Sequence, residues 1–126
     1  MKALHKLLVA SLVIISSNAF AAEMPKELHG RYVSSDQSCV EMLKTFKEFG
    51  EWGGIEINAE GKYSFDGSCN ATKVTGSKGN YTISESCSLE GESYNSVNNY
   101  KKEGNNLFMK NKEMQLRYIR CDSAKK

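Results

Sequence analysis

Four cysteines are the residues of this 126-residue chain whose chemistry is most distinctive. Cysteine side chains can bind zinc, act as nucleophiles or pair as disulfides, and four of them allow three pairings. An even number in a small exported chain favours two disulfides over thiol chemistry. The four residues are Cys39, Cys69, Cys87 and Cys121.

The spacing of two of these cysteines predicts which of them pair. Cys69 and Cys87 each lie nine residues from Lys78, the centre of a Gly-Ser-Lys-Gly turn signal. A regular hairpin would place them opposite each other, within disulfide reach. Because this register puts Val74 on the face opposite Tyr81 and Ile83, we also expect a β-bulge. The two remaining cysteines would tie the start of a helix to the last strand, so the predicted disulfides are Cys69–Cys87 and Cys39–Cys121.

Few other side chains offer catalytic chemistry. His29 is the only histidine after the first 21 residues, so a zinc site lacks ligands if the cysteines are oxidised, and no acidic calcium loop occurs. Glu90 and Glu92 flank Gly91 on one face of a predicted strand, and glycosidases use two carboxylates. Alternating glutamates on a strand more commonly form a solvated face. We therefore predict a protein that is not an enzyme and that carries no metal or cofactor.

Exposed aromatic residues would mark a binding surface. We expect Trp52 and Tyr118 in the core, whereas the sequence leaves Tyr94 and Tyr100 open between core and surface. The predicted binding-surface residues are Tyr94, Tyr100, Glu90 and Glu92.

Residues 1–21 match a secretory signal peptide of bacterial type. Lys2 and Lys6 give a basic start, the apolar run at 7–15 is too short to span a membrane, and a small-x-small cleavage pattern ends at Ala21. Cleavage would leave a single domain at 22–126, about 105 residues long. We expect this domain to be periplasmic or secreted.

The charge of the mature chain is balanced. Without Lys2 and Lys6, 15 basic residues oppose 15 acidic residues. This balance argues against nucleic acid or an anionic membrane surface as the partner, since either favours a basic patch. No second apolar run reaches membrane length, so we predict no membrane span, and we expect a monomer.

One amphipathic helix is predicted near the N-terminus, over residues 38–49. Ser38 followed by Glu41 is a capping box, and Gly50 suits the position just after the helix. The apolar residues recur at helical spacing, so this face must pack against another element. They are Cys39, Met42, Leu43, Phe46 and Phe49.

The remainder of the chain has the pattern of a meander of short antiparallel strands. Gly, Asn and Asp separate runs that alternate between apolar and polar residues. We expect eight or nine strands, near 28–34, 54–58, 62–66, 70–75, 80–86, 88–94, 96–102, 105–110 and 114–120. Such a sheet has unpaired edges unless it closes. The predicted fold is a mainly β, small antiparallel barrel with the helix packed on it or plugging one end, and the alternative is an open curved sheet covered by the helix.

Several motifs resemble those of small exported bacterial β-proteins that have paired cysteines and no settled function. They are Gly30-Arg31-Tyr32, Gly54-Ile55-Glu56-Ile57, Lys73-Val74 after Cys69, the run from Cys87 to Glu92, and Tyr118-Ile119-Arg120-Cys121. Gly-x-Tyr ahead of a meander also resembles the opening of lipocalins and calycins. These resemblances imply a lipocalin-like barrel and an exported location.

The exported scaffold and its few catalytic groups favour one function class. We expect a non-enzymatic periplasmic or secreted binding protein that contacts a protein or polysaccharide partner. One alternative is an inhibitor or immunity protein against a secreted lysozyme or protease. Others are a small-ligand carrier and a hydrolase acting through Glu90 and Glu92.

Overall fold

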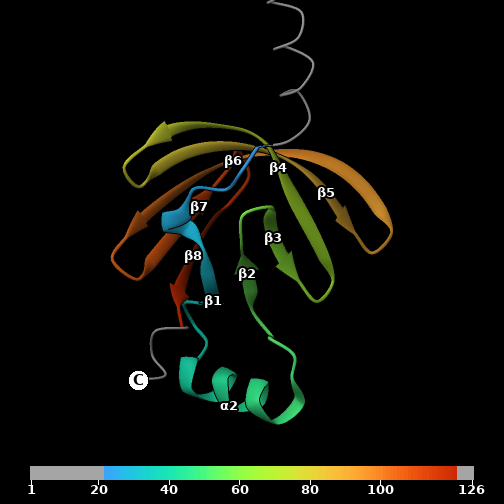
Figure 1. Cartoon of the computed structure of the whole chain (residues 1–126), viewed down its shortest axis with the longest axis vertical. Coiled ribbons are helices and arrows are strands. Elements are labelled where there is room, and N and C mark those ends of the chain that lie inside the picture. The colour runs from blue at the N-terminus through green and yellow to red at the C-terminus, as the bar shows by residue number, and fades with distance from the viewer. Residues whose placement is uncertain (1–21, 122–126) are drawn as a thin grey trace, which may run out of the picture.

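Eight antiparallel strands form a closed barrel in the computed structural model, which describes residues 22–121 (Figure 1). Each strand pairs with the next along the chain, and β8 pairs with β1 to close the barrel. The predicted barrel is therefore confirmed, and the predicted signal peptide lies outside the described residues. The strands are β1 (Gly30–Ser34), β2 (Ile55–Ile57), β3 (Gly61–Ser64), β4 (Gly67–Ser77), β5 (Asn80–Leu89), β6 (Glu92–Glu103), β7 (Asn106–Lys110) and β8 (Gln115–Arg120).

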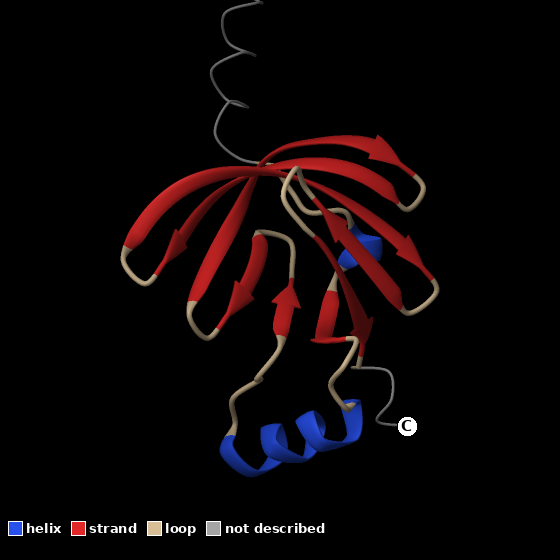
Figure 2. Ribbon diagram, turned by 180° about the vertical axis from the view of Figure 1, so that it is seen from behind, coloured by secondary structure: helices blue, strands red, loops and turns tan. Residues whose placement is uncertain are grey.

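Two-residue turns connect the three longest strands, β4, β5 and β6. Figure 2 shows how strongly these strands curve. Lys78-Gly79 has φ values of 50° and 81°, and Glu90-Gly91 has 49° and 88°. Positive φ at both central residues gives the turn whose twist matches that of the strands. The strand predicted over 88–94 is wrong because the chain reverses within it, at Glu90-Gly91. Residues 22–121 therefore contain eight strands, the lower of the two expected numbers.

The predicted hairpin disulfide and its bulge are both confirmed. Cys69 and Cys87 are opposite each other on β4 and β5 and form a disulfide with Cα atoms 4.0 Å apart. A bulge between Ala71 and Lys73 shifts the register by one residue. Val74 is thereby paired with Ile83, so that its side chain returns to the inward face.

Helix α2 (Cys39–Phe49) lies outside the barrel, below β1 and β2 in the view of Figure 1, and does not plug it. Its predicted ends are confirmed: the Ser38 hydroxyl accepts a hydrogen bond from the Glu41 amide, and Gly50 has φ 79°. Phe46 is 4.5 Å below the Arg31 guanidinium on β1, and the Cys39–Cys121 disulfide holds the helix start. The apolar stripe is only partly covered, since Phe49 is 71% exposed.

A short N-terminal segment closes one end of the barrel instead. It contains the 3-10 helix η1 (Lys26–Leu28), and the side chains of Met24 and Leu28 are buried in the core. The Met24 amide donates to the Ala59 carbonyl, and the Tyr32 hydroxyl donates to the Leu28 carbonyl from inside the barrel. Leu28 was expected to begin the first strand, but it forms part of this plug. The rest of the core consists of inward-facing side chains, chiefly Tyr32, Ile57, Ala71, Ile83, Tyr100 and Leu107.

No helix within residues 22–121 is long and apolar enough to cross a membrane.

Candidate binding site at the open end of the barrel

Exposed apolar side chains from two adjacent hairpins lie at the barrel end opposite the plug. Phe65, in the turn between β3 and β4, is 84% exposed. Leu89 at the end of β5 is 40% exposed, and Tyr94 near the start of β6 is 47% exposed. Large apolar groups that gather at one place on a surface mark interaction sites. We call these three residues the rim.

A small cavity of about 170 Å³ opens beside the rim. Leu89 and Tyr94 contribute to its wall, together with Tyr118 from β8. Lys62 and the sulfur-bearing Cys69 belong to its lining on the β3–β4 side. The cavity therefore combines an apolar wall with one ammonium group and one disulfide.

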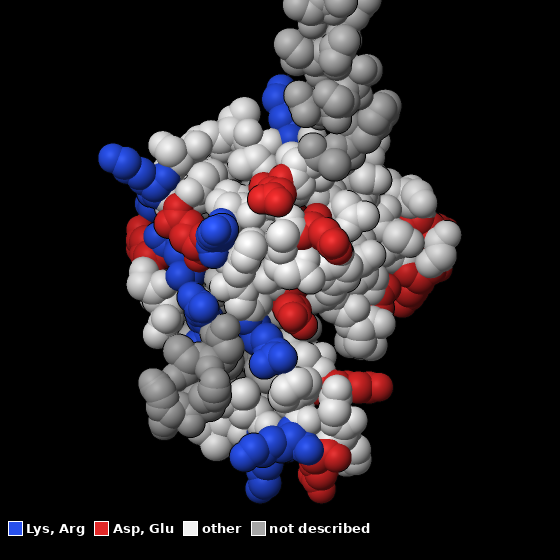
Figure 3. All heavy atoms as spheres, in the orientation of Figure 1, with Lys and Arg blue, Asp and Glu red and all other residues white. Residues whose placement is uncertain are grey.

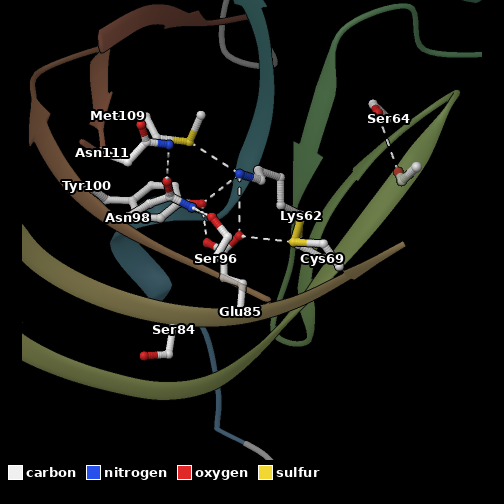
Figure 4. Close-up of polar contacts among 12 residues, drawn as sticks. Lys62, Ser64, Cys69, Ser84, Glu85, Ser96, Asn98, Tyr100, Met109 and Asn111 are labelled. Carbon is white, nitrogen blue, oxygen red and sulfur yellow. Dashed lines mark hydrogen bonds and ion pairs between the residues drawn. A yellow bond between two sulfur atoms is a disulfide. The ribbon is translucent and has the colours of Figure 1, made fainter. Parts of the chain in front are cut away.

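Lys62 connects this cavity to a polar cluster inside the barrel (Figure 4). Its Nζ is 3.4 Å from Glu85 Oε1 and donates hydrogen bonds to the Tyr100 hydroxyl at 2.8 Å and to Met109 Sδ at 3.2 Å. The Tyr100 hydroxyl in turn donates to Glu85 Oε2. The Lys62 side chain is 14% exposed and the Glu85 side chain 1%, so lysine lies on the cavity side of the pair.

Burial sets the protonation behaviour of this cluster. It lowers the pKa of Lys62, and the neighbouring Glu85 carboxylate opposes that change. Burial also raises the pKa of Tyr100 well above its usual value, and the charge of Glu85 raises it further. The phenol therefore stays protonated and can donate to Glu85. The Tyr118 phenol, at the cavity wall, has its pKa raised by burial as well.

Amide side chains extend the cluster toward the β7–β8 loop. Asn111 Nδ2 donates to Asn98 Oδ1 at 3.0 Å, and Asn98 Nδ2 donates to the Ser96 hydroxyl at 3.1 Å. Sequence analysis missed Lys62 and Glu85 as site residues. The sequence did contain a sign of Glu85, because it alternates along β5 with Ile83 and Cys87, whose side chains both face inward.

A second hollow lies outside the barrel, next to the rim. This groove has a volume of about 520 Å³, and Ser64 belongs to the lining of both the groove and the cavity. Phe65 also lines it. The other residues that line the groove are Glu51, Trp52, Gly54, Glu56 and Tyr63.

The structure places some of the predicted binding-surface residues on the surface and one of them in the core. Tyr94 lies on the rim, and Glu90 and Glu92 are exposed at the nearby β5–β6 turn. Tyr100 is fully buried and does not belong to the surface, because inward-facing β6 positions fill the narrow barrel. Glu90 and Glu92 do not share one strand face, because Glu90 is in the turn itself.

One group of potential metal ligands lies close together inside the barrel. The sulfurs of Cys69 and Cys87 and an oxygen of Glu85 are within 4.8 Å of one another. Both sulfurs belong to the disulfide and offer no thiolate, which zinc binding requires. His29 contacts the Met24 carbonyl oxygen at 3.0 Å and holds the plug.

The open end thus brings together the rim, a small cavity above a buried ion pair, and an outer groove. Comparison with protein families, curated proteins and solved structures found no match for this chain.

Proposed function

We propose that this protein is a non-enzymatic binding protein of the periplasm or extracellular space, which recognises a protein partner through the open end of its barrel. The observation that carries the proposal is the position of Phe65. Phe65 is 84% exposed and lines the groove, and it directly follows Ser64, which lines both the groove and the cavity. Aromatic side chains at the centre of an interface supply much of its binding energy.

The interior of the barrel favours a protein partner over a small ligand. Sites for small molecules have volumes of about 300–1,000 Å³ and enclose most of the ligand. The cavity here is about 170 Å³, and Tyr32, Tyr100 and their neighbours fill the space below it. A cavity of this size suits one inserted side chain of a partner.

The scaffold also suits recognition, because two of the three rim residues are on paired strands. Leu89 and Tyr94 are on paired strands that a two-residue turn connects. The Cys69–Cys87 disulfide crosslinks β5 to β4 next to that end. A site that is ordered before binding loses little entropy when the partner binds.

Affinity capture with rim variants tests the proposal. The oxidised mature chain would be used as bait against envelope extract and culture fluid from the organism that produces it. We expect it to retain a protein that then forms a stoichiometric complex in native mass spectrometry when both components are pure. Phe65→Ala combined with Tyr94→Ala should weaken this complex about tenfold or more.

The matched control is Val97→Ala, which changes another exposed apolar residue (57%) on β6, on the outer face of the barrel. Its complex should have the affinity of the unmodified chain. Equal binding by the rim variant and the control, or retention of a glycan and no protein, would contradict the proposal.

A further inference from the structure

Three aromatic residues from different elements line the groove beside the rim. Trp52 follows α2, Tyr63 is on β3, and Phe65 is in the β3–β4 turn. The Trp52 indole is fixed, because its Nε1 donates to the carbonyls of Tyr32 at 3.2 Å and Ile55 at 3.1 Å. Aromatic faces carry partial negative charge and attract cations.

Two carboxylates line the same groove. Glu51 and Glu56 contribute to its lining, and no lysine or arginine does. The ion pairs among the described residues are Lys62–Glu85 and Lys101–Glu103, so neither groove carboxylate has a cationic partner there.

Arg31, on the strand next to Glu56, contacts an aromatic ring and not a groove carboxylate. Arg31 is opposite Glu56 in the β1–β2 register, but its guanidinium lies over the Phe46 ring with Cζ 4.5 Å from the ring centroid. Figure 3 shows a related pattern on the face that it displays. Acidic side chains alone appear on the right, where Figure 1 has the β3–β4 and β5–β6 hairpins, while on the left and at the helix Lys and Arg are mixed with acidic side chains.

We infer that the groove binds a lysine or arginine side chain of the protein partner, and hence that the partner presents a basic surface. This inference rests on the proposed function. The aromatic rings and the two carboxylates favour the same sign of charge, and a flat guanidinium can stack on such rings while it pairs with a carboxylate. An anionic or neutral side chain can form neither the cation–π contact with the rings nor the ion pair with a carboxylate.

An arginine-containing peptide tests the groove without knowledge of the partner. Acetyl-Arg-Gly-Arg amide would be titrated into the oxidised mature chain, with the indole N–H of Trp52 observed by NMR. Since Trp52 is the only tryptophan, its signal is unambiguous. We expect a saturable shift that weakens as salt is added, and a much smaller shift with acetyl-Gln-Gly-Gln amide.

Charge variants supply the decisive comparison. Glu51→Gln with Glu56→Gln should weaken peptide binding about tenfold. Glu23→Gln with Glu103→Gln makes the same change in charge at two exposed residues that line neither the groove nor the cavity, and should leave binding nearly unchanged. No saturable Trp52 shift, or equal binding by the two double variants, would overturn the inference.

The same variants separate this inference from the proposed function. If the captured partner requires Phe65 but binds the Glu51/Glu56 variant with unchanged affinity, the basic-side-chain inference fails and the binding function stands. If the peptide binds the groove but no protein partner is captured, the proposed function fails instead.

Discussion

A lysine and a glutamate face each other inside the barrel, where charge is expensive to bury. The Lys62–Glu85 pair is tolerated because the Tyr100 hydroxyl bridges both members of the pair. Replacing a buried pair with apolar residues is often neutral, whereas removing one partner leaves an uncompensated charge. This asymmetry gives a measurable prediction.

Lys62→Met should destabilise the protein by about 3–5 kcal/mol, because it leaves the Glu85 carboxylate buried without its cation. Urea unfolding measures the loss. Lys101→Met is the control, since Lys101 pairs with Glu103 in an exposed ion pair worth about 0.2–1 kcal/mol. Adding Glu85→Leu to Lys62→Met should recover much of the lost stability. Equal losses from Lys62→Met and Lys101→Met would contradict the claim that the buried pair is costlier to break than the exposed one.

At the scale of elements, turn chemistry explains both what the sequence predicted and what it did not. The boundaries of α2 could be predicted because Ser38 and Gly50 end the helix through local backbone geometry, which does not depend on the rest of the fold. The β5–β6 turn was missed because Glu90-Gly91 lacks the usual Asn-Gly or Asp-Gly signature, although Gly91 tolerates positive φ at no cost. The groove could not be predicted, since it depends on how the segment after α2 meets β3.

Among the contacts that hold the N-terminal plug, those of the Glu27 carboxylate make part of the stability depend on pH. The Tyr81 hydroxyl and the Gly79 amide donate to Glu27, and these hydrogen bonds lower the pKa of Glu27 below its ordinary value of 4.5. A lowered carboxyl pKa stabilises the fold above pH 4.5, and this contribution is lost as pH falls through the folded-state pKa.

Glu27→Gln should therefore be less stable than the unmodified chain at neutral pH, and the two should converge as pH falls below 4.5. Urea midpoints across this range measure the difference. Glu23→Gln changes an exposed glutamate of the same segment and should follow the unmodified chain at every pH. A constant gap between Glu27→Gln and the unmodified chain would refute the attachment through the Glu27 carboxylate.

The two disulfides connect different parts of the molecule. Cys69–Cys87 closes a separation of 18 residues within the barrel. Cys39–Cys121 closes one of 82 and joins the start of α2 to the residue that follows β8. The chain-entropy model gives about 3 and about 4–5 kcal/mol for such loops. The barrel closes through its own strand pairing, whereas α2 is anchored by one disulfide and the contacts of Phe46.

Cys39→Ser with Cys121→Ser should consequently separate the helix from the barrel during unfolding. Trp52 reports α2 docking, because its ring meets Phe46 edge-on with centroids 5.8 Å apart. In this variant we expect Trp52 fluorescence to change at a lower urea concentration than the far-ultraviolet circular dichroism of the strands. In Cys69→Ser with Cys87→Ser both signals should move together, because the loss lies within the barrel. If the two transitions coincide in the Cys39/Cys121 variant, helix and barrel form one cooperative unit. If they are separate, the groove should lose its affinity for arginine before the barrel unfolds, because Trp52 lines the groove.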